Sequence, residues 1–356
     1  MSGTLDPRLI EQEIGRIRER ESNPYSSGIK TNLFTLLIFR AATVRTGGGR
    51  AAGGDDPTAA ALQYLLGKRP ARIITIERTA APRTEAVVSG RCFPDRRNRG
   101  VCFEEVRIAS GDDGLGADPG AWAPLLIRDL PVYAWWPEGL PVHADPGYDA
   151  LLGAAGLIDK LIVDTARAAQ SAADPVAPLR ALRLLRARTA AAFPVSDFAW
   201  HRGRVLRELT ARAFDLPETR RLLTAIRSVR LDAGFRGEAL LFFLWLSARL
   251  GWAPTSPKAA LPSFRDPHGR EVSVDYPGDD TSDGKPLSDG FRLVFSFEGA
   301  PDLEIGCTRG GCVSSGTEKG AYRFPSDGEI LLVEVDTLPA DALFQEVLDH
   351  AGNLLA

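Results

Sequence analysis

The sequence predicts an α/β protein with an N-terminal Rossmann-like α/β domain containing a mixed sheet. A C-terminal α+β domain with helices and an antiparallel sheet is predicted to follow. Two observations support this class. Before about residue 174, apolar runs of strand length alternate with helical patterns and turns. After it, four helical segments precede a series of short alternating strands. The expected domains are a helical arm over 1–30, an α/β domain over 31–174 and a second domain over 175–356.

The N-terminal elements are predicted from apolar periodicity and turn residues. Pro7–Arg20 is predicted as an amphipathic helix, because Asp6 can cap it and its isoleucines fall on one stripe. A strand, helix, strand unit with a right-handed crossover follows. The expected strands are Leu33–Phe39, Arg72–Glu77, the hairpin Glu85–Arg91 with Val101–Ile108, and Leu157–Asp164; the expected helices are Thr58–Leu66 and Ala121–Arg128.

The C-terminal half is predicted as helices followed by a sheet. The strand Phe291–Phe297 alternates cleanly between apolar and other residues, so one of its faces should be buried. The expected helices are Leu179–Ala192, Val205–Phe214, Pro217–Val229, Gly237–Leu250 and Pro339–Leu348. The other expected strands are Val272–Tyr276, Leu303–Cys307, Ala321–Phe324 and Ile330–Val335.

A Trp-Trp pair, Trp135-Trp136, ends a short apolar strand bracketed by Pro131 and Pro137. Side chains alternate along a strand, so the two indoles point to opposite faces. We expect one ring in the core, with the other looking outward or packing against a helix or the second domain. The segment is therefore either a structural plug or a binding edge.

Composition narrows the class of protein. The chain has 356 residues, with 44% apolar and 25% charged residues and a net charge of −3. These values are typical of a globular protein and give no global reason to expect nucleic-acid binding. No apolar run approaches the roughly 20 residues of a membrane span, and the N-terminus lacks a signal core. We therefore expect a cytoplasmic protein without a membrane partner.

A glycine-rich loop, 46–54, follows the first expected strand and precedes a helix, where backbone N–H groups favour an anion. Its spacing departs from the dinucleotide fingerprint, no Lys-Ser/Thr follows as in a P-loop, and Asp55 and Asp56 oppose phosphate. A surface loop is the favoured interpretation, and nucleotide binding is the alternative.

Four cysteines are too few for a disulfide scaffold, and a cytosolic location would keep them reduced. Cys307 and Cys312 share a Gly-rich turn and form the candidate redox pair. A zinc site would need two further ligands that no second tight pair supplies, so metal binding is disfavoured. The other interpretation is a hairpin turn with ordinary thiols.

The segment 180–230 is basic, and its start combines aromatic and basic residues: Trp200, Arg202, Arg204 and Arg207. The segment has three interpretations: a solvated helix face, a protein-docking face or a nucleic-acid site. The segment contains no known nucleic-acid recognition motif, so nothing in it favours nucleic-acid binding. Arg204 and Arg207, three apart on one helix, are the preferred docking candidates. No motif for nucleophilic catalysis stands out, and no catalytic residue is predicted.

Four segments together resemble the glucose-6-phosphate dehydrogenase assembly protein family, OpcA. Asp129–Pro137 is similar to its LPV-x-x-WWP segment, and Pro70–Ile74 to its PaRv strand entry. Asp197–Trp200 followed by Arg204 and Arg207 resembles DLAW…R…R. The helix Ala239–Trp252, with Trp245 and Trp252, resembles LL-x-x-WLA-x-RLGW. The resemblance runs from about residue 30 to the C-terminus.

The resemblance implies a non-enzymatic partner that assembles or allosterically activates glucose-6-phosphate dehydrogenase. Such a partner would support the oxidative pentose phosphate pathway and NADPH supply, and would require no cofactor or small ligand. Trp135, Trp136, Pro137, Trp245 and Trp252 are then family markers, the last two more typical of a core. The alternative is a sugar-phosphate- or nucleotide-binding enzyme or sensor with a Rossmann-like domain.

Overall fold

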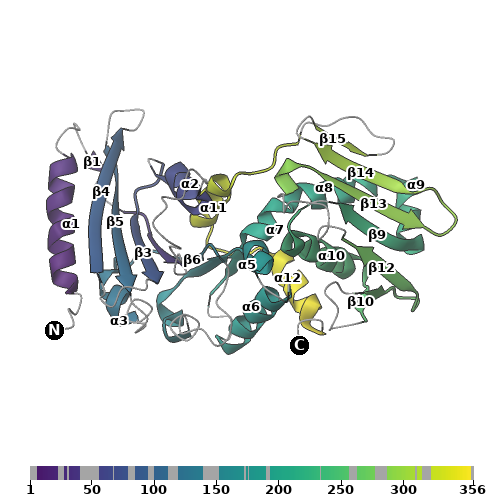
Figure 1. The fold of residues 1–356 in the computed structure, drawn as a ribbon, viewed down its shortest axis with the longest axis horizontal. Helices are drawn as coiled ribbons and strands as arrows, with labels where there is room; N and C mark the ends of the chain where they lie inside the picture. Colours follow the sequence, from purple (N-terminus) through teal and green to yellow (C-terminus); the bar gives the residue numbers. More distant parts are fainter. Residues whose placement is uncertain are drawn as a thin grey trace, which may run out of the picture. The chain divides into compact units, whose positions relative to one another are not determined.

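A computed structural model describes residues 6–22, 28–29, 32–40, 56–66, 68–78, 85–94, 100–110, 119–138, 152–171, 174, 176–189, 193–232, 234–255, 263–276, 287–308, 311–314 and 322–353. Its contacts divide the chain into two compact units. Unit 1 comprises Met1–Val163, Leu185–Ser196 and Ser326–Pro339. Unit 2 comprises Asp164–Leu184, Asp197–Pro325 and Ala340–Ala356. Figure 1 shows the elements of both units.

The sheet of unit 1 is mixed and mostly parallel. Its strands are β1 (Gly28–Ile29), β2 (Thr35–Arg40), β3 (Arg72–Arg78), β4 (Glu85–Pro94), β5 (Gly100–Ser110), β6 (Val132–Trp136), β7 (Lys160–Val163) and β8 (Val195–Asp197). They follow the order β1-β5-β3-β2-β6-β7-β8, with β4 paired to β5. Pairing is parallel from β5 through β3, β2 and β6 to β7, and antiparallel between β4 and β5. The central strands are buried along nearly their whole length, as is usual when both faces of a parallel sheet are covered.

Both indoles of the Trp-Trp pair are buried, so of the alternatives for the second ring the outward-looking one is wrong. Strand β6 lies between two parallel neighbours, and all five of its residues are buried. The Trp136 ring stacks on Phe39 with centroids 4.4 Å apart. Phe39 in turn meets Trp122 edge-on at 6.2 Å. Because side chains alternate, the buried Trp135 ring lies on the other face of the sheet.

The N-terminal helix α1 (Pro7–Ser22) packs on strands β4 and β5. Its stripe Ile10, Ile14 and Ile17 is buried as predicted. At Gly90 a Cβ atom would lie 2.8 Å from Ile17 Cγ2, so only glycine fits this close approach without displacing the helix. Arg72, buried in β3, donates to Glu104 Oε2 at 2.9 Å and to Glu11 Oε1 at 2.5 Å, which ties the helix to the sheet.

The segment Ile330–Val335, predicted as a strand, is part of helix α11 (Asp327–Asp336) in unit 1. A capping box starts this helix: Ser326 Oγ accepts from Glu329 N, and Glu329 Oε2 accepts from Ser326 N. The helix packs on α2 (Pro57–Leu65). A Cβ at Gly328 would lie 2.4 Å from Tyr64 Cβ, so the glycine permits the close crossing.

Unit 2 contains the second sheet. Its strands are β9 (Ile226–Asp232), β10 (Ala253–Pro254), β11 (Phe264–Arg265), β12 (Glu271–Asp275), β13 (Phe291–Phe297), β14 (Leu303–Thr308) and β15 (Gly311–Ser314). They follow the order β10-β11-β12-β9-β13-β14-β15. The β9–β12 pair is parallel, so the expected antiparallel sheet is in fact mixed. The alternation predicted for β13 is confirmed, since Phe291, Leu293, Phe295 and Phe297 are buried.

Two further assignments in this unit were wrong. The predicted helix Pro217–Val229 is only α9 (Pro217–Arg220) and a 3-10 turn before β9 begins at Ile226. Val229 and Leu231 are fully buried in that strand, where alternation decides the structure. Residues 322–324 of the expected strand Ala321–Phe324 form no regular element, and residue 321 lies outside the described part.

The helices of unit 2 pack around α10 (Arg236–Leu250), which is buried on almost every side over its first three turns. The neighbours that contact it are α5 (Thr165–Ser171), α7 (Phe198–Arg202) and α12 (Ala342–His350). Two more helices are α6 (Ala177–Arg188) and α8 (Arg204–Ala213). Trp245 and Trp252 are buried, which places these two tryptophans in the core, as expected. Within the described residues, no helix has the length and apolar character to cross a membrane.

Candidate functional site

Three of the four residues predicted to dock a partner are interior residues. The exposed fractions of Trp200, Arg202 and Arg207 are 1%, 6% and 9%. Their side chains therefore present no docking surface in this structure, and of the preferred docking candidates Arg204 and Arg207 only Arg204 is exposed. Arg204 is exposed and pairs with Glu208 on the same helix, Nε to Oε1 2.7 Å.

Trp200 is the centre of a buried cluster in unit 2. Its Nε1 atom donates to Asp341 Oδ2 at 2.8 Å, and its ring lies 5.3 Å from that of Phe344. Asp341 also caps α12 by accepting from the backbone N–H groups of Leu343 and Phe344. The Trp200 side chain thus fixes the start of the C-terminal helix to α7.

Arg207 covers the other side of the Trp200 ring. Its guanidinium carbon lies 3.4 Å from the ring centroid, a cation–π contact, and its Nη1 donates to the Trp200 carbonyl at 2.8 Å. Burial lowers the pKa of Arg207 to about 9, although the carboxylate of Asp341 partly opposes that shift. These contacts explain the Trp and Arg spacing of the segment as a packing requirement.

Arg202 lies among buried carboxylates. It forms a two-bonded pair with Asp164, at 2.6 Å and 3.1 Å, and its Nη1 is 3.8 Å from Glu238 Oε1. Arg167 adds a second cation, 3.2 Å from Asp164 Oδ2. Burial raises the pKa of Glu238 to about 7, with the Arg202 charge acting against the rise.

Asp197 completes this buried acid cluster, defined as Asp164, Asp197, Arg202 and Glu238. It accepts from Thr165 Oγ1 at 2.5 Å, from Thr165 N at 3.2 Å and from Ala199 N at 2.9 Å, which caps α7. Burial first, and then the neighbouring charge of Asp164, raises the pKa of Asp197 to about 7.

The role of the buried acid cluster is structural. Its four side chains are enclosed, and a guanidinium occupies the space between Asp164 and Glu238. Among the residues that the structure describes, no group of three metal-ligating side chains is arranged to hold an ion. Asp164 and Glu238 were missed by sequence reasoning. The signal was present at Glu238, three residues after the cap of α10, which is the usual place for a capping glutamate.

The four cysteines form two disulfides, so the expectation that they remain reduced is corrected. Cys92 faces Cys102 across the β4–β5 hairpin, and Cys307 faces Cys312 across β14–β15. Directly opposed positions in an antiparallel pair bring two sulfur atoms within bonding reach. The candidate redox pair Cys307–Cys312 is buried, whereas Cys92 and Cys102 are partly exposed.

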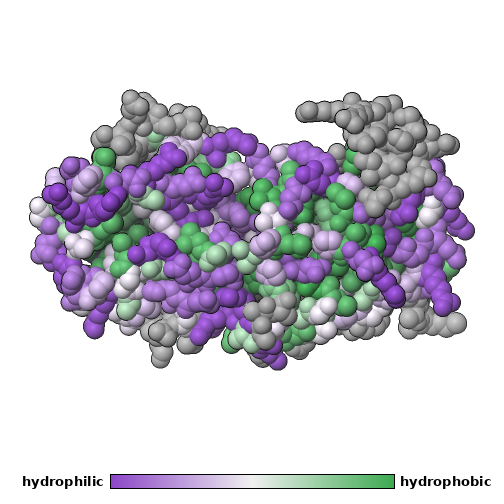
Figure 2. All heavy atoms as spheres, turned by 180° about the vertical axis from the view of Figure 1, so that it is seen from behind, coloured by the Kyte–Doolittle hydropathy of each residue, from purple (hydrophilic) through white to green (hydrophobic). Residues whose placement is uncertain are grey.

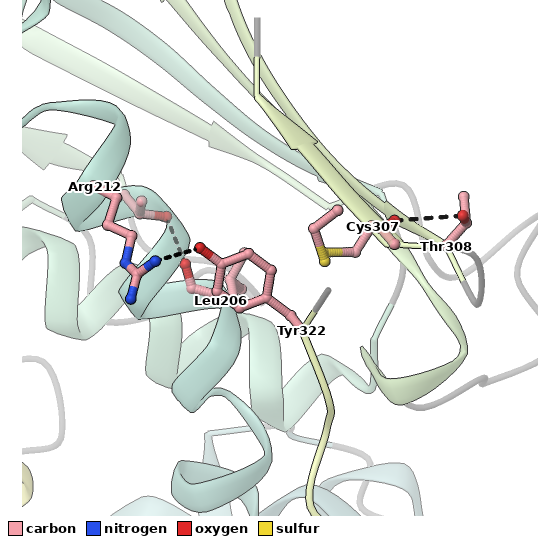
Figure 3. Close-up of a disulfide and its surroundings, with 8 residues drawn as sticks. Leu206, Arg212, Cys307, Thr308 and Tyr322 are labelled. Atoms are coloured by element: carbon pink, nitrogen blue, oxygen red, sulfur yellow. Dashed lines mark hydrogen bonds between the residues drawn. A yellow bond between two sulfur atoms is a disulfide. The ribbon is translucent and has the colours of Figure 1, made fainter. Parts of the chain in front are cut away.

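Figure 3 shows the surroundings of Cys307. Tyr322 lies between the disulfide and helix α8, and its hydroxyl accepts a hydrogen bond from Arg212 Nη1 at 2.7 Å. The antiparallel pairing of β14 with β15 agrees with the hairpin interpretation of 307–312, but its two cysteines are bonded to each other and are not ordinary thiols. The glycine-rich loop 46–54 lies outside the described residues.

A concave surface in unit 1 was not found by sequence reasoning. This β6–β7 cleft, of about 620 Å³, lies at the amino ends of the two strands. Its walls are residues 123, 124 and 126–132, with Gly156, Leu157, Asp159 and Leu338. Leu338 is about 180 residues from Leu157 along the chain, so no local pattern predicts the cleft. Apolar and hydrophilic residues are interspersed over the face of the molecule in Figure 2.

Two family descriptions match successive parts of the chain. The glucose-6-phosphate dehydrogenase subunit N-terminal domain matches residues 63–183, and the corresponding C-terminal domain matches residues 193–348. Together they span well over half of the sequence.

Three relatives provisionally named OxPP cycle protein OpcA agree with this match. The chain is 28% identical to that of Nostoc punctiforme, over 99% of this chain and 80% of the relative. It is 30% identical to that of Synechococcus elongatus, over 70% of this chain and 58% of the relative. It is also 30% identical to that of Synechocystis sp., over 54% of this chain and 39% of the relative.

Proposed function

The chain belongs to the OpcA family of glucose-6-phosphate dehydrogenase subunits, and we propose that it is a non-enzymatic assembly factor and allosteric activator of that dehydrogenase. In this role it acts in the cytoplasm and supports the oxidative pentose phosphate pathway and its supply of NADPH. It needs no cofactor of its own.

The observation that carries the proposal is the pair of successive domain matches, which reach into both compact units. The chemistry of the Trp200–Arg207 segment agrees with it. Trp200, Arg202 and Arg207 are used for packing inside unit 2 rather than for presenting reactive groups. A rigid scaffold of this kind suits a protein that acts by binding.

The mechanism follows from linkage. An activator shifts an enzyme only by binding its active state more tightly than its inactive state. A factor of ten in substrate affinity corresponds to a coupling free energy of about 1.4 kcal/mol. A few well-placed surface contacts can supply this difference. Arg204, exposed on α8, is the remaining docking candidate of the basic segment.

The test uses the purified dehydrogenase and the purified chain. Size-exclusion chromatography with light scattering should show a complex heavier than either protein alone. The same samples should show a lower apparent KM for glucose-6-phosphate or a higher rate. Separate elution together with unchanged kinetics would reject the proposal.

A second candidate function is binding of a nucleotide or sugar phosphate by a Rossmann-like domain. The observation in its favour is the parallel order β5-β3-β2-β6-β7, which corresponds to the 3-2-1-4-5 order of dinucleotide-binding sheets. It differs in one crossover, because β4 rather than a helix precedes β5. A thermal-shift screen of NADP and sugar phosphates on the isolated protein separates the two functions, since a ligand of the folded state raises Tm.

A further inference from the structure

The β6–β7 cleft lies at the amino ends of two parallel strands of unit 1. It lies beside Val132, the first residue of β6, and Asp159, immediately before β7. Nucleotides and cofactors bind parallel α/β sheets at the carboxyl ends of the strands. A cleft at the opposite edge is thus displaced from the usual cofactor crevice and is free to serve another molecule.

The walls of the cleft expose apolar surface. Leu157 and Leu338 are each 43% exposed, and Leu126, Ile127 and Leu130 are half-buried beside them. Only eight large apolar side chains are strongly exposed in the described part of the chain, and two of them meet here. Covering such surface releases about 25 cal/mol for each Å² of apolar area. A projecting apolar side chain is the occupant that gains this energy.

The rim of the cleft adds charge. Asp129 and Asp159 are exposed carboxylates, and Arg128 is the single cation among the lining residues. Asp159 is held in place because its Oδ2 accepts from Val132 N at 2.8 Å. The excess of negative charge complements a cationic residue on the occupant.

The backbone at the rim is strained in a way that fixes this arrangement. Asp129 has φ of 64°, and it is the non-glycine residue with a positive φ in the described part of the chain. Such a conformation costs about 1 kcal/mol and persists where surrounding structure enforces it. It turns the chain between Arg128 and the buried strand β6, so the rim carboxylate is presented from a rigid turn.

We infer that the β6–β7 cleft is the docking socket for a protein partner that inserts an apolar side chain flanked by lysine or arginine. This inference rests on the proposed function, under which the partner is the dehydrogenase. It assigns the docking surface to unit 1 rather than to the basic segment of unit 2.

The test measures the affinity of the dehydrogenase for variants of the full chain. The apolar wall is removed by the double variant Leu157→Asp/Leu338→Asp. Leu216→Asp is the matched control, because Leu216 is 54% exposed and lies in unit 2. The double variant should bind at least about tenfold more weakly, as for loss of an interface anchor. The control should bind within about twofold of the unsubstituted chain.

The charge is tested separately by Asp129→Asn, since asparagine tolerates the left-handed conformation. This variant should keep the Tm and bind more weakly, with a smaller dependence of affinity on salt. If the unsubstituted chain binds the dehydrogenase and both cleft variants bind equally well, the socket is disproved and the proposed function stands. If the unsubstituted chain does not bind, the proposed function fails and the socket with it.

Discussion

Lys160 Nζ lies 2.6 Å from Glu334 Oε2, and both side chains are buried in unit 1. The same ammonium donates to the carbonyl groups of Glu334, at 3.2 Å, and Thr337, at 2.5 Å. One lysine of the sheet therefore holds the segment Ser326–Pro339, which returns to unit 1 after the whole of the second sheet. Arg69 reinforces it through two bonds to Asp336, at 2.9 Å and 2.7 Å.

Removal of one partner of this pair should destabilise the protein strongly. Lys160→Met leaves Glu334 as an uncompensated buried charge, which costs about 3–5 kcal/mol of unfolding free energy. Lys160→Met/Glu334→Leu should recover much of that loss, because apolar groups can replace a buried pair at little cost. Urea unfolding measures both. Equal stability of Lys160→Met and the unsubstituted chain would show that the pair does not hold the segment.

Arg207 and Arg204 should differ sharply although they are one helical turn apart. Arg207→Glu places a buried carboxylate near Asp341 and removes the cation–π contact, so Tm should fall by several degrees. Arg204→Glu alters only an exposed ion pair and should leave Tm within about a degree. Thermal unfolding followed by circular dichroism compares them. Similar losses in both would contradict the buried placement of Arg207.

If Arg204 contributes to docking, Arg204→Glu should weaken dehydrogenase binding most at low salt, where charges are least screened, with Tm unchanged. Arg212→Glu, on the same helix, serves as the charge-matched comparison. Binding isotherms at two ionic strengths decide the point. Unchanged affinity at both would remove Arg204 from the interface.

The buried acid cluster should make stability depend on pH. Asp197 and Glu238 have ordinary pKa values of 3.8 and 4.5, raised by burial to about 7 in the folded protein. The folded state therefore binds more protons than the unfolded state between about pH 4 and 7. This stabilisation is fully present below the unfolded pKa values and is lost as pH rises through about 7. The free energy of unfolding should thus fall between pH 5 and pH 8.

Asp197→Asn tests the origin of that dependence. It removes the titrating group, so the slope of unfolding free energy against pH should become shallower. The substitution of an exposed carboxylate, Asp275→Asn, provides the control and should leave the slope unchanged. Equal slopes in the unsubstituted chain and in both variants would show that Asp197 does not cause the pH dependence.

The two disulfides should differ in accessibility to reductant. Cys92 and Cys102 are partly exposed beside α1, whereas Cys307 and Cys312 are buried near Tyr322. Limited treatment with a small thiol reductant should open Cys92–Cys102 first. Alkylation followed by peptide mass spectrometry identifies the free thiols. Earlier labelling at Cys307 would show that exposure in this conformation does not control reduction.

The strands with unambiguous periods could be predicted from sequence. The run at β2 and the alternation at β13 each admit one reading, and the helix around Trp245 is long enough to exclude a strand. The strand prediction for Ile330–Val335 was wrong because a short run rich in β-branched residues fits a strand and a helix equally well. The capping box at Ser326 and Glu329 was the deciding signal.

The site was harder to predict because it depends on contacts between distant segments. The Asp197–Arg207 region stands out by its aromatic and basic residues, but its sequence cannot show that Asp341 and Asp164 lie opposite it. Helical spacing placed Arg204 and Arg207 on one face, whereas packing against Trp200 buries only the second. Burial of arginine needs a long-range partner, and that partner is invisible to a local pattern.

The most direct test of the account is the initial rate of glucose-6-phosphate dehydrogenase at substrate below KM, measured while the chain is titrated in. The account predicts a saturable rise in rate that ends at a fixed ratio of the two proteins and disappears when substrate is saturating, if activation acts on substrate affinity. A rise in maximal rate would assign the effect to assembly of the active oligomer. A flat titration at both substrate levels would contradict the central claim.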